Sequence, residues 1–425
     1  MNLAHLKFGN SLARRSDRLK AVVLDSFHRP SLEIQARLRE FTLDDWKHIL
    51  FWLDISGLAL YLLDQLTQMH LTSSLPPSIL SRLEADLTDN RERAASLFRE
   101  ASAISHELAA RRVSFALLKG MTLSPDSVSD PALRWQIDLD FLVAACDGPC
   151  ATEILCTSGY ALYATSKNTL EFKAGQPDKP DVRAIYRIRS QRSLEVHLLN
   201  TDQSCDSRRA DPLMRANLRS FDGVMIPTLC SADILIQQAV HLFKHLCNEH
   251  TRASWVLEFW RHVTIRRSDE KLWHEVEVIA AGDSQAEVAL GASVLLTTLA
   301  FGDFAPDSLC YRMRRLPPAV RMWIETYGMR ALLAGSPGNK MYLILRGQLQ
   351  QGNEARGEAR RLVFPIHLPP LITRSEPGET FLAQLRRYRI EANHLRARMR
   401  FHILEGIRYA IESARWQRRI ARGAE

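Results

Sequence analysis

The sequence predicts an α+β protein, in which a small mixed or antiparallel sheet is embedded between N-terminal and C-terminal helical regions. Three observations predict this class. Apolar residues recur at helical spacing through residues 30–112. Short apolar segments that end in glycine or in polar turns, which is typical of strands, occupy residues 113–228. The helical spacing returns at Ser231 and continues to about residue 350.

The first helical region contains three apolar stretches. Residues 41–66 begin with Phe-Thr-Leu-Asp-Asp, in which the Thr-Leu-Asp-Asp sequence can cap a helix. Residues 75–87 begin after prolines, and residues 90–112 have an amphipathic pattern without glycine or proline. We therefore expect a helix over each stretch.

The middle region is expected to supply the strands. Residues 113–120 (VSFALLKG) and 137–143 (IDLDFLV) are short and apolar, and residues 146–160 have the pattern of a turn, a helix and a glycine stop. Alternating polarity predicts further strands, most of them in an antiparallel meander, at 168–175, 181–190, 193–200 and 223–229.

These patterns divide the chain into four expected segments. They are an N-terminal helical region at 1–112, an α+β core at 113–228, a helical domain at 229–363, and a proline-rich break with a basic helix at 364–425. The third segment opens on a Ser-Ala-Asp sequence that can cap its first helix.

Composition sets broad limits on the class of protein. A chain of 425 residues with 46% hydrophobic and 24% charged residues is typical of a globular protein with more than one structural unit. No uncharged apolar stretch reaches about 18 residues, so we expect no transmembrane segment. The N-terminal residues also lack the apolar stretch of a secretory signal. The seven cysteines include no C-x-x-C pair, which favours reduced thiols and a cytoplasmic location.

Basic residues are concentrated at the C-terminal end. The net charge is +8, and the chain from Arg374 onward contains 12 arginines and 6 glutamates. This favours an acidic partner such as phosphate, nucleic acid or an anionic surface. The alternative is a helix that packs on the helical body and keeps its arginines in water.

Two aspartates interrupt the apolar segment IDLDFLV. Because side chains alternate along a strand, Asp138 and Asp140 point to one face, while Leu139 and Phe141 point to the core. Two carboxylates at this spacing can converge on divalent cations, and Mg²⁺ prefers oxygen ligands. The alternative is an edge strand with solvated aspartates.

Other residues extend the candidate site. Glu195 lies between apolar neighbours in SLEVHLLN, and it faces the same pocket if the two strands are adjacent. Lys119 and Gly120 end the preceding strand, where a glycine lets the backbone approach a phosphate and a lysine adds charge. Two roles for Arg134 fit the sequence: it can bind a phosphate, or it can neutralise the charge of the aspartates. His197 shares the face of Glu195 and can orient either Glu195 or the acceptor.

The combination resembles the uncharacterised nucleotidyltransferases of the polymerase-β superfold. Their pattern is a helical lead-in, then LKG, then R-x3-D-x-D, then E-x-H. The matching residues are Leu118-Lys119-Gly120, Arg134, Asp138-Leu139-Asp140-Phe141-Leu142-Val143 and Glu195-Val196-His197. The likeness begins near Asp45-Trp46 and fades after about residue 262.

The resemblance implies metal-dependent transfer from a nucleotide. Asp138, Asp140 and Glu195 would bind Mg²⁺ (or Mn²⁺), and Glu195 would act as, or assist, the base for the acceptor hydroxyl. Lys119 and Gly120 would border the phosphates. Well-known members of the superfold have a serine after the glycine, where this chain has Met121, so that phosphate contact is lost. Glu258 stands where the nearer family tends to have an aspartate.

The helix that follows also contributes candidates. His241 and His245 are one turn apart, a spacing that can bind zinc. We favour a polar face in which Lys244 closes over the nucleotide, and the remaining reading is that these are surface or core histidines.

We therefore expect a cytoplasmic nucleotidyltransferase that uses a nucleoside triphosphate or nucleotide sugar. The acceptor is a small molecule, sugar or peptide, because the resembling family is associated with exopolysaccharide and lasso-type peptide gene clusters. The alternatives are glycosyl or other group transfer from a nucleotide sugar to a modified peptide, and a non-catalytic nucleotide-binding protein. Nucleic-acid binding through the arginine-rich tail is less favoured.

Overall fold

The protein is described from a computed structural model, which covers residues 11–28, 31–176, 185–200, 211–221, 223–349, 361–365 and 380–423. The chain forms two compact units. The first comprises Met1–Leu242 and Arg252–Arg315, and the second comprises Phe243–Thr251 and Leu316–Glu425. The division into four segments that we expect from the sequence stays a prediction.

The first unit begins with helices, as predicted: α1 (Ser11–His28), α2 (Leu32–Arg39), α3 (Leu43–Ser56), α4 (Ala59–Gln68) and α5 (Pro77–Ala110). The predicted cap of α3 is a capping box. The backbone N–H of Asp45 donates to the Thr42 hydroxyl at 3.2 Å, and the N–H of Thr42 donates to the Asp45 carboxylate at 3.0 Å. Gly57, at a φ of 74°, ends the helix in the left-handed conformation.

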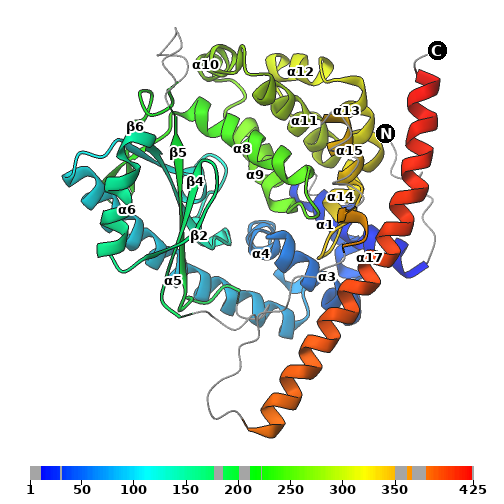
Figure 1. The fold of residues 1–425 in the computed structure, drawn as a ribbon. Coiled ribbons are helices and arrows are strands. Elements are labelled where there is room, and N and C mark those ends of the chain that lie inside the picture. Colours follow the sequence, from blue (N-terminus) through cyan, green and yellow to red (C-terminus); the bar gives the residue numbers. More distant parts are fainter. Residues whose placement is uncertain are drawn as a thin grey trace. The chain divides into compact units, whose positions relative to one another are not determined.

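The two stretches expected before Val113 form the single helix α5, which has 34 residues. Neither glycine nor proline separates them, so nothing interrupts the helical hydrogen bonds. This helix runs along one face of the sheet (Figure 1). Its residues Leu97, Phe98, Ala101, Ile104 and Leu108 pack into the core beneath the strands.

A seven-stranded mixed sheet has the order β3-β4-β5-β2-β1-β7-β6. Its strands are β1 (Phe115–Leu118), β2 (Asp138–Ala144), β3 (Ala161–Thr165), β4 (Thr169–Ala174), β5 (Arg192–Leu199), β6 (Asn217–Phe221) and β7 (Val224–Thr228). The pairs β2–β5 and β1–β7 are parallel, and the other pairs are antiparallel. The α+β class is thereby confirmed.

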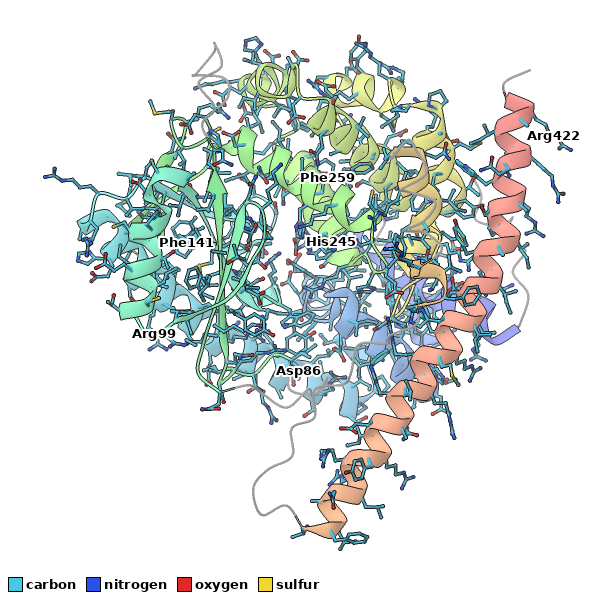
Figure 2. All side chains as sticks on the ribbon, in the orientation of Figure 1. Asp86, Arg99, Phe141, His245, Phe259 and Arg422 are labelled. Atoms are coloured by element: carbon cyan, nitrogen blue, oxygen red, sulfur yellow. The ribbon has the colours of Figure 1, made fainter. Side chains whose placement is uncertain are left out.

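One face of the sheet carries the hydrophobic core. Leu139 and Phe141 of β2 are each 1% exposed, and Leu194 of β5 is fully buried. They pack with α5 and with α6 (Gly148–Thr157), and Figure 2 labels Phe141 on the side of the sheet toward α6. The opposite face, which carries the aspartates, is turned toward α9 (Ala253–Ile265; Figure 1).

The prediction of a strand at 181–190 is wrong for the described residues of this range. Residues 181–184 lie outside the described part of the chain, and residues 185–190 form turns and bends. The carbonyl of Ile185 accepts a hydrogen bond from Arg93, and Tyr186 is buried with its hydroxyl 3.4 Å from Asp54. This segment therefore satisfies its polar groups on the N-terminal helices rather than on a strand. Strands β3 and β6 were not predicted, and their residues are mostly exposed.

Helices complete the first unit: the start of α8 (Ser231–Leu246), then α9, α10 (Glu270–Ala280), α11 (Ser284–Phe301) and α12 (Asp307–Arg314). By length and composition, α11 is the one described helix apolar enough to cross a membrane, and the bent pair α3–α4 passes the same test only if taken as one span. Within the structure 67% of the α11 window is buried, and this helix packs against α9 and α12.

The second unit is also helical. It contains α13 (Pro318–Trp323), a π-helical turn (Ile324–Gly328), α14 (Met329–Leu333), α15 (Tyr342–Leu349) and the 43-residue α17 (Phe381–Gly423). The expected basic C-terminal helix is confirmed as α17, which has Arg422 in its last turn (Figure 2). Trp416 is 1% exposed and packs against Tyr327 with ring centroids 6.2 Å apart. Most of the predicted proline-rich break, residues 366–379, lies outside the described residues.

Candidate functional site

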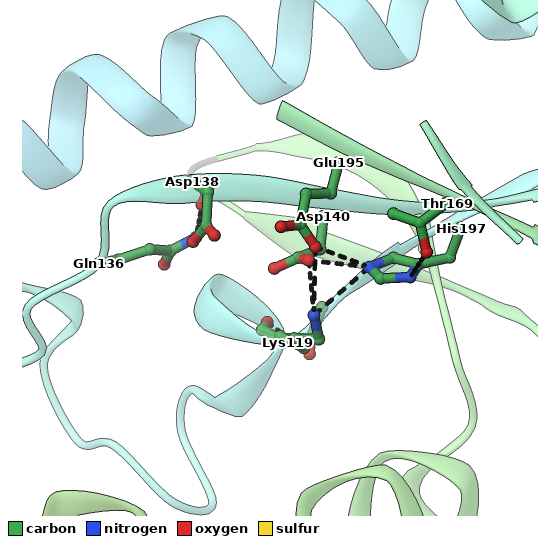
Figure 3. A network of polar contacts seen from close by, with 8 residues as sticks. Lys119, Gln136, Asp138, Asp140, Thr169, Glu195 and His197 are labelled. Carbon is green, nitrogen blue, oxygen red and sulfur yellow. Dashed lines mark hydrogen bonds and ion pairs between the residues drawn. The ribbon is translucent and has the colours of Figure 1, made fainter. Parts of the chain in front are cut away.

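The strands β2 and β5 lie side by side, as the placement of Glu195 required. In their parallel ladder, Asp140 is the direct partner of Glu195. Leu139 and Phe141 point into the core, so alternation places Asp138 and Asp140 on the opposite face. Glu195 faces the same side as Asp140 (Figure 3).

Asp140, Glu195 and His197 form one cluster, hereafter the acid cluster. Each offers one potential metal-ligand atom, and these atoms all lie within 4.8 Å of one another. The His197 Nε2 is 3.0 Å from Asp140 Oδ1 and 3.4 Å from Glu195 Oε2, and its Nδ1 is 3.3 Å from the Thr169 hydroxyl. Within the described residues this is the group with the spacing of a metal site.

Lys119 supplies the positive charge next to the acid cluster. Its Nζ donates to Asp140 Oδ1 at 2.6 Å and lies 4.0 Å from Glu195 Oε2 (Figure 3). The side chain of Asp140 is only 4% exposed, whereas that of Glu195 is 34% exposed. Glu195 is therefore the carboxylate of this pair that solvent and a substrate can reach.

The pKa values of the carboxyl groups diverge. Burial opposes ionisation of Asp140, but the hydrogen bond to His197 and the charge of Lys119 outweigh it and lower the pKa to about 2. Burial, followed by the charge of Asp140, raises the pKa of Asp138 to about 6. The hydrogen bond to His197 lowers the pKa of Glu195. Burial opposes protonation of His197, but its hydrogen bonds to Asp140 and Glu195 raise its pKa.

The Lys-Gly turn has a strained backbone and a steric requirement. Lys119 and Gly120 have φ values of 47° and 40°, and such strain in a non-glycine residue is typical of functional sites. A Cβ on Gly120 would lie 2.2 Å from Nε2 of Gln136. That Nε2 donates to the carbonyl of Asp138 at 2.7 Å. The absence of a Cβ at Gly120 therefore leaves room for the Gln136 side chain, which holds the start of β2 in place.

Arg134 has a carboxylate partner that neither reading of the sequence named. Its Nε donates to Glu258 Oε1 at 3.2 Å, and the Tyr61 hydroxyl donates to the same oxygen at 3.0 Å. The side chains of Arg134 and Glu258 are 14% and 2% exposed. Asp138 acts on Arg134 only as a weaker electrostatic neighbour. The predicted phosphate contact of Arg134 stays a prediction.

Two pockets adjoin these residues. A small one of about 40 Å³ is lined by Lys119, Arg134, His241, Trp255 and Glu258, among others. A larger one of about 490 Å³ borders the Lys-Gly turn, and its lining includes Gly120, Gln136 and Arg134. The larger volume is in the range of small-molecule sites.

The structure brings some predicted residues together and leaves others apart. Lys119, Asp140 and Glu195 meet in one network with His197. Asp138 is two residues before Asp140 on the same face, but it is not one of the three clustered ligands. Lys244 is an exposed residue near the end of α8, in the second unit, and its role stays a prediction.

Gln136 is a site residue that the sequence reasoning missed. The signal was weak, because a glutamine between Arg134 and Asp138 has no motif of its own. His241 lines the small pocket and packs edge-on against Trp255, with ring centroids 4.7 Å apart. A zinc site at His241 and His245, the less favoured interpretation of their spacing, is not among the candidate ligand groups of the described residues.

The donor set fits a divalent cation. Two carboxylates suit Mg²⁺ and Mn²⁺, and the added imidazole suits Mn²⁺ better than Mg²⁺. Lys119 already neutralises part of the acidic charge in the protein alone. A bound cation would therefore compete with, or displace, the ammonium group of Lys119.

Comparisons with known proteins identify the family of the chain. A sequence model of the uncharacterised nucleotidyltransferase family matches residues 42–302. A crystal structure of an antigenic nucleotidyltransferase-like protein from Paracoccidioides brasiliensis is similar at 11% sequence identity and a TM-score of 0.29, covering 47% of this chain and 92% of that chain. No curated protein matches the chain. Because the family match spans more than half of the chain and contains the whole acid cluster, the chain belongs to the uncharacterised nucleotidyltransferases and is a nucleotidyltransferase.

Proposed function

We propose that this nucleotidyltransferase transfers a nucleotidyl group from a nucleoside triphosphate to an acceptor hydroxyl in a reaction that depends on Mg²⁺ or Mn²⁺. The observation that carries this proposal is the pairing of Asp140 with Glu195 across two parallel strands, beside His197 and Lys119. This arrangement puts two carboxylates on one rigid face of a sheet, which is what convergence on a cation requires.

Asp140 and Glu195 would hold the cation, and Asp138 would extend the site along β2. When bound, the cation would supply charge for the triphosphate and orient it for in-line attack. The side chains of the chain itself hold the site in shape. Lys119 keeps Asp140 ionised, and Gln136 fixes the backbone of Asp138.

Glu195 is the best-placed group to accept the proton of the acceptor. It is the more exposed carboxylate of the pair, and the hydrogen bond to His197 keeps it ionised. His197 lies 3.4 Å from Glu195 and can take up or redistribute that proton. The acid cluster can therefore combine cation binding with general-base assistance.

The acceptor is proposed to be a small molecule, a sugar or a peptide in a natural-product or polysaccharide pathway of the cytoplasm. The pocket of about 490 Å³ beside Gly120 and Gln136 supports an acceptor of modest size. A nucleotide sugar is the alternative donor.

One experiment tests the reaction class. The protein is incubated with each nucleoside triphosphate or nucleotide sugar and with Mg²⁺ or Mn²⁺, and donor loss and products are followed by mass spectrometry. A double variant, Asp138→Ala with Asp140→Ala, is run in parallel. Metal-dependent nucleotide binding should be lost in the double variant. If metal-dependent binding persists in the double variant, the face of β2 that carries Asp138 and Asp140 is not the nucleotide site.

A further inference from the structure

Arg252 is a partly buried cation that contacts two indole rings. Its guanidinium carbon is 4.2 Å from the centroid of the Trp135 ring and 5.3 Å from the centroid of the Trp255 ring. Trp135 belongs to the segment that leads into β2, and Arg252 is the residue immediately before α9. Two distant parts of the first unit therefore position this one side chain.

The described residues place no carboxylate in contact with Arg252. The neighbouring Arg134, by contrast, donates to Glu258. Burial, followed by the charge of Arg134, lowers the pKa of Arg252 to about 10, although Asp138 and Glu258 act in the opposite direction. Contact with aromatic faces offsets only part of the free energy of withdrawing a cation from water. The described residues therefore provide no directly bound anion for this charge.

This charge lies on the side of the sheet that carries the acid cluster. Asp138, which attracts Arg252, is on the same face of β2 as Asp140. The indole Nε1 of Trp135 is also buried and has no hydrogen-bond partner among the described residues. Among the described residues, the guanidinium of Arg252 and the indole N–H of Trp135 thus have no hydrogen-bond acceptor.

We propose that Arg252 binds a phosphate group of the donor nucleotide and contacts it from the side opposite the acid cluster. This inference rests on the proposed function. A triphosphate carries the oxygen acceptors and the negative charge that the surroundings of Arg252 lack. A planar guanidinium binds phosphate through two parallel hydrogen bonds, and its faces remain stacked on indole rings while it does so. Trp135 and Trp255 hold the guanidinium in position for this contact.

The binding test uses the full chain with Mn²⁺ and two kinds of probe, inorganic tripolyphosphate and each nucleoside triphosphate, in titration calorimetry. Arg252→Gln should weaken binding of both by about 10- to 100-fold, because a charge-assisted hydrogen bond is lost. Arg252→Lys should give a smaller loss, since charge remains but the paired geometry does not. Equal affinity of the wild type and Arg252→Gln for both probes would overturn the proposal.

Arg261 provides a matched control. Arg261 is on α9, and its guanidinium carbon lies 5.1 Å from the centroid of the Tyr61 ring. It is nine residues further along, which is about 13 Å of helix. Arg261→Gln should leave the affinity for tripolyphosphate within about twofold of the wild type. An equal loss in both variants would show a general effect of charge and would overturn the specific role of Arg252.

A second measurement separates binding from a structural role. Arg252→Met keeps apolar contact with both indoles and removes the repulsion by Arg134, so the melting temperature without ligand should stay equal or rise. A lower melting temperature would show that Arg252 mainly joins Trp135 to Trp255, and it would overturn the proposal.

If the wild type binds no nucleotide with either cation, the proposed function fails; if the wild type binds and Arg252→Gln binds equally, only this inference fails.

Discussion

Asp140 and Glu195 are direct partners in the parallel ladder between β2 and β5. Both side chains leave the sheet on the face opposite the core, and Lys119 and His197 contact them there. The position of each carboxylate is thus set by strand register. A shift of one residue would turn either group into the core, so hydrophobic patterning protects the geometry of the site.

The first prediction concerns this pair. Asp140→Asn and Glu195→Gln should each lower nucleotidyl transfer by about a thousandfold, because each removes a charge that must bind the cation. Initial rates at saturating donor and Mn²⁺ provide the measurement. Glu171→Gln is the control, because Glu171 pairs with Glu195 across β4 and β5 but forms its ion pair with Lys173. Full activity of either site variant would contradict the assignment.

The sequence was sufficient for the strands β1, β2, β4, β5 and β7 and for the shared face of Asp138 and Asp140, because a period of two follows from strand geometry alone. It was also sufficient to place Glu195 opposite them, given adjacent strands. The partner of Arg134 was not predictable, since Glu258 lies on a helix far along the chain and nothing local specifies that contact. The role of Gln136 depends on a backbone turn at Lys119 and Gly120, which sequence patterns do not encode. Strands β3 and β6 were missed because their exposed residues lack an apolar pattern.

The second prediction concerns Gly120. Gly120→Ala places a Cβ against Gln136 in a left-handed conformation, and it should destabilise the protein by about 2–4 kcal/mol. Gly159→Ala isolates the conformational part of this effect, because Gly159 has a φ of 86° and no heavy atom lies within 4 Å of the position that its Cβ would take. That control should cost about 1 kcal/mol.

Chemical denaturation of both variants measures the difference. The double variant Gly120→Ala with Gln136→Ala should recover the part of the loss that comes from the clash, leaving a value near that of Gly159→Ala. If the double variant recovers no stability, the Gln136 side chain does not pack against Gly120.

The third prediction concerns the buried ion pair of Arg134 and Glu258. Glu258→Ala should destabilise the protein by about 3–5 kcal/mol, because it leaves a buried guanidinium unpaired. Tyr61→Phe removes one donor to the same carboxylate and should cost about 1 kcal/mol. Replacing both charged residues by methionine should cost less than Glu258→Ala alone. Urea unfolding measures all three, and a double variant less stable than the single one would refute the argument.

The last prediction concerns pH and the start of α3. The hydrogen bond from Arg15 lowers the pKa of Asp45 from 3.8 to about 2, although burial acts against it. Since the folded-state pKa lies below the unfolded value, ionised Asp45 stabilises the folded chain above about pH 4, and this stabilisation is lost as the pH falls toward 2. Asp45→Asn should therefore reduce the melting temperature at pH 7 and reduce it progressively less below pH 4. Asp44→Asn, in the same helical turn but with an 86% exposed side chain, should change the melting temperature little at any pH. An equal effect of the two substitutions at pH 7 would show that the capping box and Arg15 do not stabilise this helix.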